Sequence, residues 1–162
     1  MTFHAGFDQL PADADLSAGD GKANVPAAPH ELREGLLGKA LLCGRTPVSF
    51  AAQGNVDLSR PGALAVWISP QDWKRQGETP YLFFLILHGS GRSLMLARMG
   101  GTANQEALYA HAQVGEHAAS ALSGHTRDWN AGGWHLLVLN WRAEAVEFSV
   151  DGGELQRAGA PW

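Results

Sequence analysis

The chain of 162 residues is long enough for one domain with a hydrophobic core and too short to expect two. Charged residues make up 17% and hydrophobic residues 45%, which excludes a disordered or supercharged chain. The net charge of −4, without any basic run, argues against a nucleic-acid-binding protein, whose affinity depends on clustered Lys and Arg. We therefore expect a single domain over residues 1–162.

Cysteine usage and the first residues bear on the compartment. Cys43 is the only cysteine, so no intrachain disulfide can form, and its place beside leucines predicts a small buried side chain. The first ten residues, MTFHAGFDQL, lack the basic and apolar regions of a signal peptide. The longest apolar run, Leu82–Leu87, is too short to span a membrane. These features predict a protein made in the cytoplasm without a signal peptide and without membrane insertion.

Twenty glycines and eight prolines favour an all-β fold with many turns. The first strand is expected over Phe3–Phe7, followed by a long loop over residues 8–34 that leads into the domain. Two further short strands are expected over Gly38–Leu42 and Val48–Phe50.

Residues 63–69 alternate in the way that a half-buried strand requires. Leu64, Val66 and Ile68 fall on one face, and Ala65 and Trp67 on the other. Tyr81–His88 is apolar on both faces, which predicts a central strand covered on both sides, and Ser93–Met99 returns as its hairpin partner. Glu106–Ala112 predicts a weaker strand, and residues 112–128 predict a long surface loop with at most one edge strand.

Residues 129–153 carry the strongest pattern in the chain. A turn at Trp129–Gly133 leads into an apolar strand over Trp134–Trp141, and Val146–Val150 then alternates apolar and polar residues. Asp151-Gly152 is a strong tight-turn dipeptide. The tail over residues 154–162 has room for one short strand, near Glu154–Ala158.

Two of these blocks resemble laminin-G-like, concanavalin A-like domains. They are W-x-x-G-x-W-H with its D-G turn (129–152), and the run L-S-x-P-G-A-L-A-V-W-I-S-P-Q-D-W (58–73). The resemblance implies a two-sheet antiparallel β-sandwich of jelly-roll type, in which His135 has a packing role. The chain departs from the family at Gly133, where an acidic residue is common. It also departs in the short stretch after the D-G turn, where members often have further strands.

Catalytic motifs are missing from the sequence, so we expect no enzyme activity. The E-x-D-x-x-E strand of related glycoside hydrolases, which places two carboxylates for acid and nucleophile chemistry, does not occur. Glu147 and Asp151 share a strand face without a third carboxylate, and we expect a solvated surface there. Three histidines lack the spacing of a zinc site: His111, His117 and His125.

A calcium site is one interpretation of the acidic loop. Asp13, Asp15 and Asp20 supply the hard oxygen ligands that calcium takes. An EF-hand does not fit, because Ala18 stands where glycine is required and Asn24 where the bidentate glutamate is required. The resemblance implies that one calcium could still be held by loop oxygens. The alternative is that these side chains cap turns.

Six tryptophans raise the question of sugar binding, since sugars stack on aromatic rings. Those expected inside strands, and therefore in the core, are Trp67, Trp134 and Trp141. In loops we expect Trp73 and Trp129, as candidate ligand-binding residues. Trp162 is a candidate interface residue, because tryptophan is frequent in interface hot spots.

Two functions remain open from the sequence. One is a structural or decorating component of a larger assembly such as a phage virion, in the head or tail, with other protein chains or further copies of this chain as partners. The other is a glycan-binding, lectin-like adhesion module. Burial of loops or edges by other chains would favour the first, and an exposed aromatic platform on a sheet or loop rim would favour the second.

Overall fold

The computed structural model describes residues 1–25, 30–43, 47–71, 81–89, 91–98, 107–126 and 128–162. The chain divides into two compact units, unit 1 (Met1–Asp57) and unit 2 (Leu58–Trp162). All regular structure in the described residues is β, which confirms the all-β prediction. In this part of the chain, no helix is long and apolar enough to cross a membrane. The single domain expected over residues 1–162 stays a prediction.

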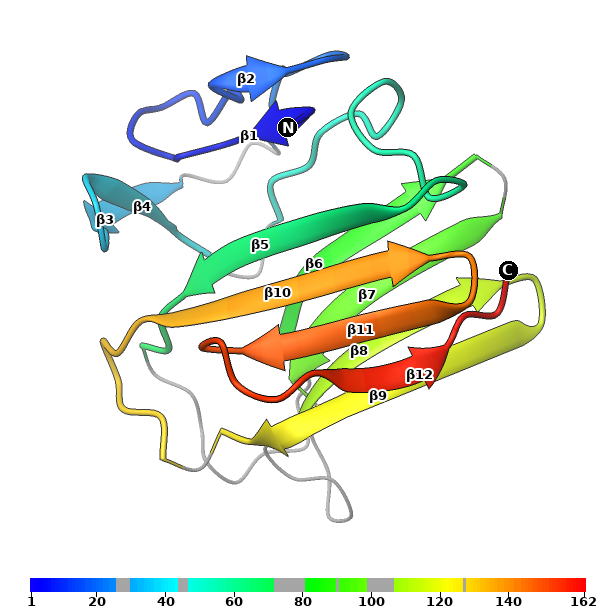
Figure 1. Ribbon diagram of the computed structural model, residues 1–162. Helices are drawn as coiled ribbons and strands as arrows, with labels where there is room; N and C mark the ends of the chain where they lie inside the picture. Colours follow the sequence, from blue (N-terminus) through cyan, green and yellow to red (C-terminus); the bar gives the residue numbers. More distant parts are fainter. Residues whose placement is uncertain (26–29, 44–46, 72–80, 90, 99–106, 127) are drawn as a thin grey trace. The chain divides into compact units, whose positions relative to one another are not determined.

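Unit 1 is built from two short two-stranded ladders (Figure 1). Strand β1 (Phe3–His4) pairs with β2 (Leu16–Ser17), and β3 (Glu31–Glu34) pairs with β4 (Lys39–Leu42). The long loop expected over residues 8–34 therefore contains β2 and β3. The strand expected over Val48–Phe50 is a single bridge between Ser49 and Asn24.

The first sheet of unit 2 has the order β12-β11-β10-β5. Its members are β5 (Gly62–Ile68), β10 (His135–Arg142), β11 (Ala145–Val150) and β12 (Gln156–Gly159). Val146 and Phe148, which the alternation predicted to face inward, are fully buried, and so are Leu137 and Leu139 on β10. Asp151 and Gly152 both have positive φ, 51° and 72°, and Gly153 N donates to Val150 O at 2.8 Å. This is the geometry of a type I′ turn, which the Asp-Gly dipeptide predicts.

The second sheet of unit 2 is a meander in the order β6-β7-β8-β9. Its members are β6 (Tyr81–His88), β7 (Arg92–Arg98), β8 (Ala107–Val114) and β9 (His117–His125). All three pairings are antiparallel, with register shifts near Leu82/Phe84 and Ala107/Tyr109. The one edge strand allowed within the loop predicted over residues 112–128 is β9, and it takes up most of that range.

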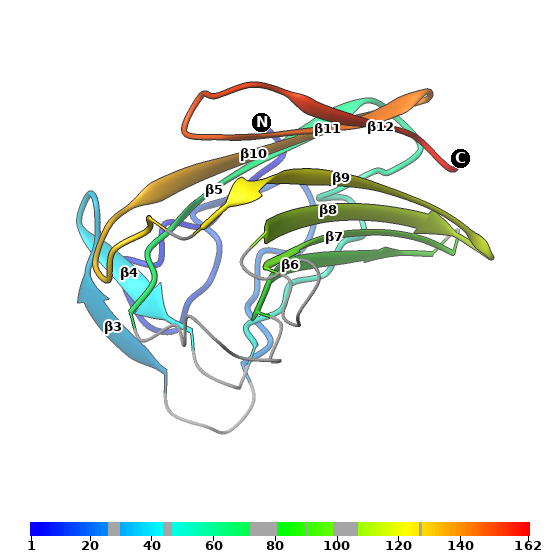
Figure 2. The ribbon, with the colours of Figure 1, turned by 90° about the horizontal axis from the view of Figure 1, so that it is seen from below.

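The two sheets of unit 2 are stacked layers, with β11 and β12 lying against β8 and β9 (Figure 2). Small side chains face inward on β8 and β9, namely the buried Ala110, Ala112 and Ala121. Larger ones, such as Leu94 and Leu96, are buried on β7. Alanines let the backbones of β8 and β9 approach β11 and β12, and the leucines fill the wider space beside them.

Four local expectations are wrong. Strand β6 is an end strand in the described sheet rather than a covered central one, and Leu87 on it is 69% exposed. Trp67, expected in the core, is 49% exposed, because its face of β5 is the outer one. Cys43 is exposed rather than buried, although partial desolvation raises the pKa of its thiol. Glu147, expected on a solvated strand face, is buried.

Candidate functional site

The outward side of the β6–β9 sheet is the candidate docking face. Strand register places Leu85, Met95, His111 and Ser120 in one row across the four strands, and Leu87, Ser93, Gln113 and Ala118 in the next. Paired residues in antiparallel strands point to the same side, opposite to the buried Leu94 and Ala112. We call these eight residues the outer face. It is apolar at β6 and polar at β8 and β9.

The apolar end of the outer face lies on the end strand of the sheet. Leu85 and Leu87 are 45% and 69% exposed, and among the described residues β6 pairs only with β7. The strand sequence, YLFFLILH, contains no acidic residue, lysine or proline that would discourage another strand from pairing with it. An apolar end strand of this kind can pair with a strand of another chain.

The polar end of the outer face holds a small hydrogen-bonded cluster. His111 Nδ1 lies 2.8 Å from the Tyr109 hydroxyl and 3.0 Å from Ser120 Oγ. The Tyr109 and His111 rings stack, with centroids 5.3 Å apart and planes at 15°. These two residues share a side of β8, because they are two positions apart. The cluster offers ring faces beside hydroxyl groups.

Trp129, a predicted ligand-binding residue, stacks on His135 instead of standing apart. The ring centroids are 3.7 Å apart and the planes are nearly parallel, at 5°. His135 Nδ1 lies 2.8 Å from Asp151 Oδ2, and Leu136 N donates to Asp151 Oδ1 at 2.8 Å. Asp151 thus joins the end of β11 to the start of β10. These contacts agree with the packing role expected for His135.

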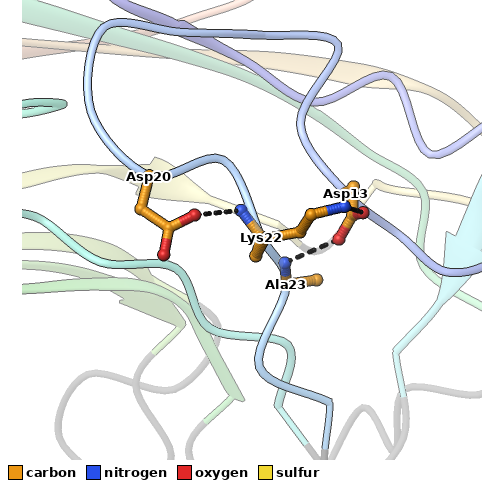
Figure 3. A network of polar contacts seen from close by, with 4 residues as sticks. All are labelled: Asp13, Asp20, Lys22 and Ala23. Carbon is orange, nitrogen blue, oxygen red and sulfur yellow. Dashed lines mark hydrogen bonds and ion pairs between the residues drawn. The ribbon is translucent and has the colours of Figure 1, made fainter.

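The carboxylates predicted to bind calcium accept hydrogen bonds from the protein (Figure 3). Asp13 accepts from Lys22 Nζ at 2.6 Å and from Ala23 N at 2.9 Å, and Asp20 accepts from Lys22 N at 2.9 Å. The hydrogen bond from Lys22, followed by that from Ala23, lowers the pKa of Asp13. The Lys22 ammonium therefore occupies the position at Asp13 that a cation would take.

The third predicted ligand, Asp15, is engaged elsewhere in unit 1. Its Oδ2 accepts from Gly6 N at 2.6 Å and lies 3.3 Å from His4 Nδ1. Within the described ranges, no three His, Cys, Asp or Glu side chains form a group that could hold a metal ion. Asp20 caps its own turn through Lys22 N, as in the alternative that the sequence left open, whereas Asp13 and Asp15 accept from amides distant in sequence, at Ala23 and Gly6.

Glu147 is the one buried acidic side chain in the described part of unit 2. It is 8% exposed, and its carboxylate pairs with Arg142 and, at 3.8 Å, with Arg157 Nε. Asp151, at the end of the same strand, is exposed and bonded to His135. The two carboxylates thus have separate structural partners.

Of the remaining tryptophans named from the sequence, Trp73 lies outside the described residues. Trp162 is half-buried, and the Arg92 guanidinium lies over its ring at 5.7 Å from the centroid. The tail that leads to it is fixed by the pairing of β12 with β11 and by Ala160 N, which donates to Glu144 O at 3.0 Å. Trp162 therefore packs on its own unit.

Comparisons with protein-family models, with curated proteins and with solved structures find no match to this chain. Functional inference therefore depends on the geometry of the chain itself. Sequence reasoning missed the outer face because its residues come from four strands, and only their register places them in rows.

Proposed function

We propose that the protein is a non-catalytic β-sandwich module that docks onto other chains, as a structural or decorating component of a larger assembly. The fold we propose is the laminin-G-like, concanavalin A-like jelly roll, and the assembly is a phage virion, in its head or tail. The stacked antiparallel sheets of unit 2 and the residue blocks at 58–73 and 129–152 support the fold. The engagement of Glu147 by two arginines supports a non-catalytic role.

The observation that carries the docking proposal is the apolar end strand β6. Leu85 and Leu87 are exposed on it, and β6 contains no Asp, Glu, Lys or Arg whose charge would discourage pairing with another strand. We propose that β6 of one molecule pairs antiparallel with β6 of a second copy around a twofold axis. Such pairing would join the two sheets edge to edge and shield both leucines.

The mass of the protein in solution tests this pairing. Light scattering coupled to size exclusion should give a dimer for the wild type over a range of protein concentrations. Leu87→Lys should give a monomer with an unchanged circular dichroism spectrum, because the two introduced lysines would repel each other across the twofold axis.

Leu155→Lys is the matched control. Leu155 is 54% exposed but lies in the turn before β12, outside the outer face, so this variant should remain dimeric. A monomeric wild type, or a Leu87→Lys variant that stays dimeric, contradicts the pairing. Cosedimentation of the protein with particles from its source tests the virion role separately, and a freely soluble pool alone would argue against it.

Glycan binding is the second candidate, and the Tyr109–His111–Ser120 cluster favours it. Stacked rings next to hydroxyl groups match the apolar faces and hydroxyls of a sugar. A glycan array with and without calcium should show binding that His111→Ala removes, while the melting temperature stays within a few degrees. Binding that survives this substitution would place the sugar elsewhere.

A further inference from the structure

A cavity of about 180 Å³ in unit 2 is lined by three arginines and a tryptophan. Arg60 precedes β5, Arg92 begins β7, and Arg142 ends β10. Trp162 forms another part of the wall, and no Asp or Glu among the described residues lines the cavity. Three guanidinium groups around one small space offer several N–H donors to a single ligand.

Arg92 is held in place by two contacts. Its Nη1 donates to the Leu58 carbonyl at 3.0 Å, and its guanidinium lies over the Trp162 ring. A guanidinium carries five N–H donors in a planar fork, so one hydrogen bond to a carbonyl leaves donors for a ligand. The Trp162 contact orients the plane and thereby reduces the entropy lost on binding.

Arg142 is fixed from the other side of the cavity. It is half-exposed and pairs with the buried carboxylate of Glu147, which Arg157 also approaches. Glu147 neutralises one arginine at most, and its carboxylate does not line the cavity. The cavity therefore presents guanidinium donors from separate segments, and all three arginines, Arg60 included, also contact neighbouring groups.

We propose that this cavity binds a small oxyanion, with phosphate or sulfate preferred over a carboxylate. Guanidinium groups pair with the oxygens of such anions through two parallel hydrogen bonds, and a doubly charged ligand balances more than one arginine. The Trp162 ring would then lie beside whatever carries the anion, such as the ring of a phosphorylated or sulfated sugar. This site is separate from the outer face and does not depend on the dimer.

Calorimetric titration of the full chain with inorganic phosphate, sulfate and acetate tests the site, at constant ionic strength set with sodium chloride. Phosphate or sulfate should bind at one site per chain, and acetate at least about tenfold more weakly. Arg142→Gln and Arg92→Gln should each weaken the binding at least about tenfold, the effect of losing one charge-assisted hydrogen bond.

Arg157→Gln is the matched control, because Arg157 approaches the same Glu147 but does not line the cavity. It should bind phosphate like the wild type. In Arg142→Gln the buried Glu147 carboxylate still has Arg157 beside it, and circular dichroism checks that Arg142→Gln and Arg92→Gln are both folded before their affinities are compared. No saturable binding by the wild type, or equal affinity in Arg142→Gln, overturns the proposal. If phosphate binds, phosphorylated and sulfated monosaccharides compared at equal concentration identify which source of the anion is preferred.

Discussion

The two units of this chain are stabilised by different means. Ala12 is the one buried apolar side chain in the described part of unit 1, whereas unit 2 has rows of buried leucine, alanine and aromatic residues on facing sheets. Unit 1 instead uses side-chain oxygens that accept backbone hydrogen bonds, at Asp8, Asp13, Asp15 and Asn55. Unit 2 should therefore respond most to changes in packing, and unit 1 to changes in polar groups and pH.

Truncation of the unit 2 core should have the largest effect. Phe148 is fully buried on β11, so Phe148→Ala should lower the free energy of unfolding by about 3–5 kcal/mol, measured by chemical denaturation. Trp67→Ala, at a large but half-exposed side chain on β5, is the comparison and should cost clearly less. Equal losses of unfolding free energy in the two variants would mean that packing between the sheets does not dominate the stability of unit 2.

A single methyl group at Gly62 tests how closely the same unit is packed. A Cβ at this position would collide with the indole of Trp141, its register partner on β10. Gly62→Ala should therefore cost about 1–3 kcal/mol by denaturation. Gly159→Ala, also in an end strand but with open space around it, is the control and should change stability little. A neutral Gly62→Ala would show that Trp141 can move aside.

In unit 1 the sharpest test is a polar one. Asn55 is 3% exposed, and its side chain accepts from Gly19 N at 2.8 Å and donates to the carbonyls of Asp20 and Ala51. Asn55→Ala should cost about 1–3 kcal/mol because these groups lose their partner. Faster amide exchange at Gly19, with unchanged exchange in β10, is the expected signature. Uniform exchange changes along the chain would contradict the division between the units.

The acid titration of Asp13 in unit 1 should produce the smallest effect. Hydrogen bonding by Lys22 and by the Ala23 amide holds the pKa of Asp13 below its ordinary value of 3.8. A carboxyl group whose pKa is lowered by folding stabilises the folded state fully at pH values above its pKa in the unfolded chain. This stabilisation is lost as the pH falls through its lower pKa in the folded protein. The Ala23 amide shift should therefore titrate below about pH 3.8, and Asp13→Asn should remove this step. A titration midpoint above that value would show that the Lys22 contact does not persist in solution.

The sequence was most informative where pattern and local chemistry agree. The alternation in β5 and β11 and the Asp151-Gly152 turn predicted strands and turn type because both depend on neighbouring residues in the chain. Strand β9 was expected only as an edge strand within a long loop, and its length was underestimated because its inward residues, such as Ala121, are small where the sheets approach each other. Small side chains carry little hydropathy signal, so their periodicity does not show in the sequence.

The candidate sites depend on neighbours that a sequence does not specify. An apolar run such as β6 looks the same whether other strands cover it or it ends a sheet, so its exposure was predicted wrongly. Trp162 was singled out for its residue type, but the arginines around it are distant in sequence and meet only through the fold. The sequence likewise did not indicate that Asp13 pairs with Lys22, since opposite charge alone does not single out one partner.

Residue-resolved amide exchange along β6 tests the proposed docking most directly. In a monomer, the β6 amides that do not bond to β7 should exchange quickly at any protein concentration. If β6 pairs as proposed, their protection rises with concentration in the wild type and not in Leu87→Lys, while protection in β8 stays constant. Fast exchange of these amides at all concentrations would contradict pairing through β6.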